Sequence, residues 1–149
     1  MRVAATEALR VALQDKEFSC EDLIAAFTEW KTGWPKREFD SKYFGKDAAY
    51  AAPAVDGKKY ILRHVHIVPV VDPDALSRWQ KILQRLGRKT SDRALVYAQD
   101  DRGNFLLIFI LEEPYAHRVA EMRTQGDREI MEGFANTAAA FIAEGKVIR

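Results

Sequence analysis

Three segments of the chain carry apolar residues at helical spacing. The first follows a capping-box pattern and predicts a helix over 20–32. The second predicts a helix that opens at Asp72-Pro73 and ends at Gly87, and the third predicts a C-terminal helix that ends at Gly145. The capping residues and apolar positions are Ser19, Asp22, Leu23, Ile24, Phe27 and Trp30, then Leu76, Trp79, Ile82, Leu83 and Leu86, then Ile130, Phe134, Ala138 and Phe141.

Other segments alternate as strands do. Residues 60–68 are rich in β-branched side chains and end before a proline, which predicts a strand. Residues 93–99 and 105–111 flank a polar turn and predict an antiparallel hairpin, whose second strand is apolar on both faces and therefore central in the sheet. Residues 3–13 fit either a strand or a helix, and residues 34–58 show no sustained period and are interpreted as an irregular loop. The pattern is that of an α+β protein.

The length of 149 residues predicts one domain, 1–149, with an ordinary core. No apolar run is long enough to span a membrane, and the first residues lack the apolar stretch of a secretory signal, so we expect a cytoplasmic protein without a membrane partner. The lone Cys20 lies at the start of a helix and is interpreted as a small buried side chain. No cofactor motif is present, and a glycine-rich phosphate loop is absent.

The charge is uneven along the chain, although the formal net charge is only +1. Six cations fall close to Trp79, a composition suited to phosphate contacts beside a flat surface on which a base stacks. A solvated helix face is the alternative interpretation. The six are Arg78, Lys81, Arg85, Arg88, Lys89 and Arg93.

The three histidines of the chain indicate a site of proton transfer. His64 and His66 are two residues apart on a predicted strand, so they share one face, whereas Arg63 takes the other face. The third, His117, follows the predicted hairpin. Histidines hydrogen-bonded within a core are the alternative. A metal site would use the His64/His66 pair with Asp92 or Glu112, but no ligand-like spacing supports it, and none is expected.

Five blocks of the sequence resemble, in order and spacing, the YafO-type toxins of bacterial type II toxin–antitoxin modules. The resemblance covers most of residues 40–141, and the hairpin with its following segment more distantly resembles the RelE superfamily. The blocks are 44–50, 64–67, 91–97, 106–111 and 117–120.

The resemblance implies a fold, an activity and partners. The fold is a RelE-like small domain, a curved antiparallel sheet backed by helices. The activity is that of an mRNA endoribonuclease that works on the translating ribosome and inhibits translation, and a cognate antitoxin neutralises it. The partners are therefore the antitoxin, the ribosome and mRNA. Residues 73–90 are longer than the family pattern, and this basic helical insertion is either a contact to the ribosome or mRNA or an unrelated insertion.

Metal-independent RNA cleavage needs a base, an acid and a cation that faces the phosphate. The resemblance implies His64 or His66 as the base and His117 as the acid, with Arg118 or Arg63 as the phosphate clamp. Two further residues match the family, Asp92, which also fits a turn cap, and Tyr97, which also fits sheet packing. The chain departs from RelE-type enzymes at Glu112 and Glu113, where those enzymes carry basic residues.

Two other functions compete with this interpretation. A ParE-like toxin would inhibit a protein target without cutting RNA, and fold alone does not distinguish it. An RNA-binding module that uses the basic segment would bind RNA in a salt-sensitive way without cleavage.

Overall fold

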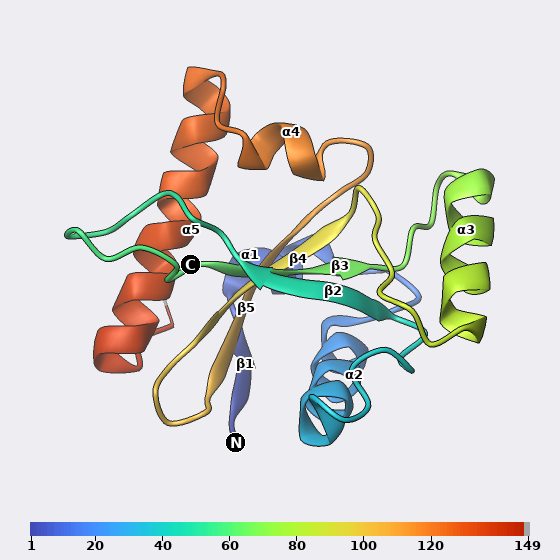
Figure 1. Ribbon diagram of the computed structural model, residues 1–149. Coiled ribbons are helices and arrows are strands. Elements are labelled where there is room, and N and C mark those ends of the chain that lie inside the picture. Colours follow the sequence, from blue (N-terminus) through green and yellow to red (C-terminus); the bar gives the residue numbers. More distant parts are fainter. Residues whose placement is uncertain (148–149) are drawn as a thin grey trace.

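A mixed five-stranded sheet in the order β1-β5-β4-β3-β2 forms the centre of the protein (Figure 1). The structure is a computed structural model, and it describes residues 1–147. Neighbouring strands are antiparallel except β1, which runs parallel to β5. The strands are β1 Val3–Ala5, β2 Phe44–Ala49, β3 Arg63–Ile67, β4 Ala94–Gln99 and β5 Phe105–Leu111.

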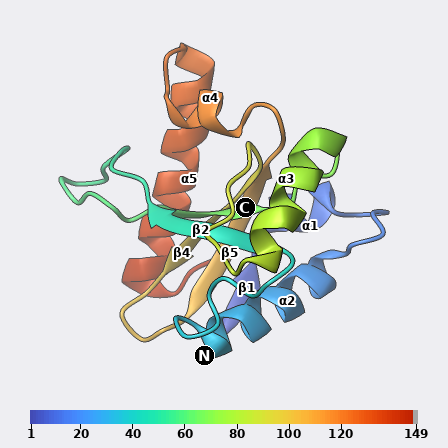
Figure 2. The same ribbon diagram turned by 45° about the vertical axis from the view of Figure 1, so that its right-hand side comes forward.

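Helices cover both faces of this sheet. Helices α1 (Glu7–Ala12) and α2 (Cys20–Gly33) pack on one face, and α4 (Ala116–Ala120) and α5 (Gln125–Glu144) pack on the other, as Figures 1 and 2 show. Each face has its own hydrophobic cluster, because the side chains of the strands alternate between the two. Helix α3 (Pro73–Gln84) lies beside the sheet rather than on a face.

Most of the elements predicted from hydrophobic spacing are present. The helix expected over 20–32 is α2, and its capping box forms between Ser19 and Asp22. The antiparallel hairpin is β4–β5, and β5 lies inside the sheet between β1 and β4, as its two apolar faces predicted. The C-terminal helix ends at Gly145, whose left-handed φ of 71° suits a residue without a Cβ. The α+β class is confirmed.

Three expectations need correction. Residues 34–58 are not wholly irregular, because β2 lies within them and pairs with β3. Residues 3–13 are both a strand and a helix, β1 followed by α1. The sheet is not entirely antiparallel, because β1 joins β5 in parallel register, with Val3 opposite Phe105.

The position of β2 depends on Gly45. A Cβ at this residue would lie 2.2 Å from the backbone oxygen of Lys89, a distance that no side chain tolerates. The same carbonyl accepts a hydrogen bond of 2.7 Å from the backbone N–H of Lys46. The absence of a side chain at Gly45 therefore lets β2 approach the segment that precedes β4.

Candidate active site

The three histidines form a row on the sheet face that α4 and α5 cover. The ring centroids of His64 and His66 are 5.7 Å apart, and those of His66 and His117 are 5.6 Å apart. His64 and His66 project from β3 on one face, as the two-residue spacing predicted, and α4 brings His117 to the end of the row. The structure thus gathers residues that are far apart in the sequence.

Two consecutive residues hold the His66–His117 pair. The Nδ1 atom of His66 lies 2.7 Å from the backbone oxygen of Ser91 and 3.1 Å from its backbone nitrogen. Asp92 holds His117, because its Oδ1 accepts from the backbone N–H at 2.8 Å and lies 2.7 Å from Nδ1. Each imidazole is therefore fixed through Nδ1, which leaves Nε2 as the nitrogen available to a substrate.

Of this pair, His66 is the residue suited to act as a base. Burial lowers the pKa of His66, and the positive charges of His117 and Lys46 act in the same direction, while the contact to Ser91 opposes them. The imidazole is thus neutral near pH 7. The shorter of its two contacts with Ser91 is to the carbonyl, and in the tautomer that makes it Nδ1 carries the proton and Nε2 keeps a free lone pair.

His64 lacks the polar partners that hold the other two rings. Its ring stacks on Tyr50, with centroids 4.0 Å apart and an angle of 12° between the planes. Its Nδ1 is the one buried side-chain nitrogen or oxygen in residues 1–147 that lacks a hydrogen-bond partner. Burial, and next the charge of His66, lowers the pKa of His64 to about 4. A neutral His64 packed on Tyr50 therefore forms the floor of the row beside His66.

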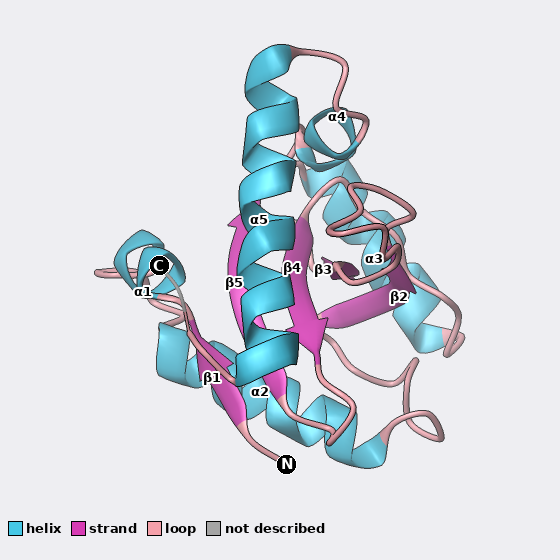
Figure 3. Cartoon of the chain, turned by 90° about the vertical axis from the view of Figure 1, so that its left-hand side faces the viewer, coloured by secondary structure: helices cyan, strands magenta, loops and turns pink. Residues whose placement is uncertain are grey.

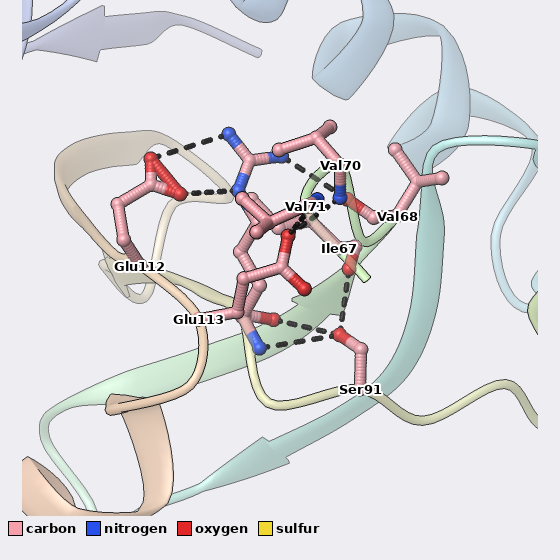
Figure 4. A network of polar contacts seen from close by, with 8 residues as sticks. Ile67, Val68, Val70, Val71, Ser91, Glu112 and Glu113 are labelled. Atoms are coloured by element: carbon pink, nitrogen blue, oxygen red, sulfur yellow. Dashed lines mark hydrogen bonds and ion pairs between the residues drawn. The ribbon is translucent and has the colours of Figure 1, made fainter. Parts of the chain in front are cut away.

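A network of polar contacts ties the ends of three segments together, as Figure 4 shows, and Ser91 links this network to His66. Arg93 pairs with Glu112 and donates to the backbone oxygen of Val68. The hydroxyl of Ser91 donates to the backbone oxygen of Ile67 at 2.6 Å. Glu113 accepts from two successive backbone N–H groups at 2.6 Å each, those of Val70 and Val71. The two carboxylates that depart from the RelE pattern therefore hold backbone and an arginine in place.

Tyr97 and Arg63 lie on the opposite face of the sheet, away from the histidines. The Tyr97 hydroxyl donates to Asp47 and accepts from Nε of Arg63 at 3.1 Å. Asp47, whose side chain is 1% exposed, also contacts Lys31 Nζ at 2.9 Å. Burial and the neighbouring Asp47 carboxylate raise the pKa of Tyr97 well above its ordinary value. The structure therefore gives these residues a structural network and does not bring them to the histidine row.

The predicted RNA-binding cations also divide into two groups. Lys89 is completely buried, and its Nζ donates to the backbone oxygen of Phe39 at 3.0 Å. Trp79 is buried too, and its indole N–H donates to the backbone oxygen of Lys42, so it is not the flat stacking surface that the composition suggested. These two expectations are corrected, because Trp79 fixes α3, and Lys89 fixes the segment after α3, to the segment before β2. Arg93 is occupied by Glu112 and Val68.

The other four cations remain on the surface. They are exposed, and within residues 1–147 none of them forms an ion pair. Three of them follow one stripe of the helix at i, i+3 and i+7. The four are Arg78, Lys81, Arg85 and Arg88.

Arg118 and Lys46 are two further cations to compare with the histidine row. Arg118 follows His117, is exposed, lies over the ring of Tyr115 at 4.4 Å, and is 4.0 Å from Asp127. Lys46 was not singled out from the sequence because its segment was interpreted as a loop. Its charge contributes to the lowered pKa of both His64 and His66. Ser91 and Tyr50 were also missed, although both lie in the blocks that carry the family resemblance.

In the described part of the chain, no three His, Cys, Asp or Glu side chains are grouped so that they would hold a metal ion. None of its helices combines the length and apolarity that a membrane span requires.

The comparisons with known proteins agree with the resemblance seen in the sequence. A family model described as toxin YafO, type II toxin–antitoxin system, matches residues 29–143. The match includes β2, all three histidines, α3 and most of α5. No curated protein and no solved structure matches the chain, so its likeness to the RelE superfamily stays a prediction. The match extends over more than half of the chain, and the chain therefore belongs to the YafO family of type II toxin–antitoxin toxins.

Proposed function

We propose that this toxin is a metal-independent endoribonuclease that cuts mRNA on the translating ribosome and thereby inhibits translation. Membership of the family implies an antitoxin as its partner. The observation that carries the proposal is the His66–His117 pair, in which two imidazoles 5.6 Å apart are each held through Nδ1 by adjacent residues.

The proposed reaction is an internal transfer at one phosphate. Nε2 of His66 takes the proton of a ribose 2′-hydroxyl, and the oxygen attacks the adjacent phosphorus. The bond from phosphorus to the 5′-oxygen breaks, and His117 donates a proton to that leaving oxygen. The products are a 2′,3′-cyclic phosphate and a 5′-hydroxyl, and no water is consumed. Each proton-transfer group is expected to contribute roughly 10²–10⁴ in rate.

Asp92 suits His117 to the role of the acid. When His117 carries a second proton, the imidazolium faces the carboxylate at 2.7 Å. We assign to Lys46 and Arg118 the stabilisation of the negative charge that develops on the phosphate oxygens. The more distant cations of α3 and of the residues after it would contact phosphates of ribosomal RNA or mRNA, namely Arg78, Lys81, Arg85 and Arg88.

The test is cleavage of a labelled mRNA by purified protein in EDTA, with translating ribosomes present or absent. We expect ribosome-dependent cuts with cyclic-phosphate ends, and a loss of at least about 100-fold in His66→Gln and in His117→Gln. Arg102→Gln, in the exposed turn between β4 and β5, is the matched control and should cut normally.

A second substrate tests the chemistry itself. An mRNA with a 2′-deoxynucleotide at the cleaved position should resist cleavage, because it lacks the attacking hydroxyl. Products with 5′-phosphates, or activity abolished by EDTA, would contradict the proposed mechanism. Translation arrest without any cut would favour a toxin that inhibits by binding alone.

A further inference from the structure

The segment between β2 and β3 forms an arm that starts and ends at the histidine row. Residues 51–62 leave the sheet at Tyr50, whose ring stacks on His64, and return at Leu62, two residues before His64. A backbone hydrogen bond of 2.8 Å from Tyr50 to Leu62 closes the base of the arm. In Figure 1 the arm extends from the sheet across α5 and projects beyond it, and Figure 3 shows the arm beside α5. The base of the arm, at Tyr50 and Leu62, therefore borders His64 on the sheet face that carries the histidine row.

The tip of the arm is a tight turn of defined geometry. Val55 and Lys58 exchange two backbone hydrogen bonds, of 3.0 and 2.9 Å. Asp56 and Gly57 between them have φ values of 49° and 77°, as a two-residue hairpin turn of the I′ type requires. The turn gives the residues that follow a fixed starting direction.

The three residues after the turn carry unused binding groups. Lys58 and Lys59 are exposed, and neither forms an ion pair with any described residue. Tyr60 is 61% exposed, the most exposed aromatic side chain described, and its φ of 63° lies in the left-handed region that large side chains rarely adopt. Glycine would adopt this backbone without strain, so the backbone conformation itself does not favour a tyrosine there.

We propose that this arm binds the RNA strand beside the histidine pair, with Tyr60 stacked on an unpaired base and Lys58 and Lys59 in contact with phosphates. This inference rests on the proposed function, because it places the RNA on the face of His66 and His117. An exposed ring next to two cations is the combination that binds single-stranded nucleic acid, since each base offers a face and each nucleotide a charge. Asp56 at the tip is the one acidic group of the arm, so the net charge of the arm is positive.

The experiment measures binding without cleavage. A labelled 2′-O-methyl oligonucleotide of mixed sequence is titrated into the purified protein, and its fluorescence anisotropy gives the dissociation constant. This probe has no free 2′-hydroxyl, so its binding does not depend on the proposed chemistry. We expect Tyr60→Ala and Tyr60→Gly to weaken binding by about tenfold, and Tyr60→Phe to bind like the parent protein.

Tyr60→Gly separates binding from folding. Glycine removes the strain of the positive φ, so this variant should unfold at the same urea concentration as the parent or at a higher one. Its affinity for the oligonucleotide should nevertheless fall. The variant Lys58→Gln/Lys59→Gln should reduce the slope of log affinity against log salt by about 1.4, whereas Lys16→Gln/Lys36→Gln, two exposed lysines elsewhere, should leave the slope unchanged.

Parent-like affinity of both Tyr60→Ala and Tyr60→Gly would overturn the role of the arm, whatever the cleavage assay shows. Weakened binding in these variants supports RNA binding by the arm even if the parent protein cuts no mRNA. The proposal on the arm and the proposal on mRNA cleavage can therefore fail separately.

Discussion

One oxygen of Asp92 contacts His117 twice, through the backbone N–H at 2.8 Å and through Nδ1 at 2.7 Å. The contact to the backbone N–H caps α4, and the contact to Nδ1 orients the imidazole. A substitution that keeps the backbone contact therefore tests the contact to Nδ1 alone.

Asp92→Asn retains an oxygen for the backbone N–H of His117 but removes the negative charge that faces the ring. We expect the variant to fold normally, to bind the 2′-O-methyl oligonucleotide like the parent, and to cut about 10- to 100-fold more slowly, because the acid is less well placed. Single-turnover cleavage on ribosomes measures the rate. An undiminished rate would show that His117 needs no carboxylate partner.

The partly buried His64 should make the protein less stable in mild acid. Its folded pKa of about 4 lies below the ordinary value near 6.5, so between these values the unfolded chain binds a proton that the folded protein does not. The free energy of unfolding should therefore fall as the pH drops from about 6.5 to about 4, by at most about 3 kcal/mol from this residue. Urea unfolding at several pH values measures it, and His64→Phe should flatten the dependence. An unchanged slope in that variant would contradict the assignment.

Replacing Asp47, on the sheet face away from the histidines, should greatly lower the stability of the protein. Its carboxylate is buried among Lys31, Arg63 and Tyr97, so Asp47→Asn leaves two cations without their partner. We expect the free energy of unfolding to fall by about 3–5 kcal/mol. The control is Asp40→Asn, whose partner Arg37 is largely exposed and whose removal should matter little. Equal effects of the two variants in urea unfolding would refute the prediction.

The exposed stripe of α3 predicts a salt-dependent contact with RNA. Arg78→Glu/Arg85→Glu should fold normally, because both side chains face solvent, and should lower co-sedimentation with ribosomes at physiological salt by about tenfold or more. Lys16→Glu/Arg102→Glu makes the same change in net charge elsewhere on the surface and is the control. Equal losses in both variants would indicate a general charge effect rather than a contact through α3.

Local periodicity explains the parts of the fold that the sequence predicted. Spacings over a short stretch of sequence determine three of these features. They are the helix that follows Ser19, the β4–β5 hairpin, and the shared face of His64 and His66. Trp79 shows the same principle in a correction, because its place in the apolar stripe of α3 predicted burial better than its basic neighbours predicted stacking on a base.

Contacts between distant segments explain what could not be predicted. Phe44–Ala49 lacks β-branched residues and becomes a strand through its pairing with β3 and the close approach of Gly45 to Lys89. The short helix α4 is capped by Asp92, which lies before β4, so no local signal announces it. The histidine row was predicted as a set of residues, but Ser91 and Lys46 enter the site only through tertiary structure.

The adjacency of Ser91 and Asp92 has an evolutionary consequence. Because Ser91 and Asp92 are neighbours in the connector before β4, a single change in the length of this connector would shift both residues away from His66 and His117, while the core clusters on either side of the sheet stay intact. A cell that acquires a toxin gene without the antitoxin gene survives only if the toxin is inactive. We expect surviving copies to carry insertions or deletions in this connector more often than in the turn between β4 and β5.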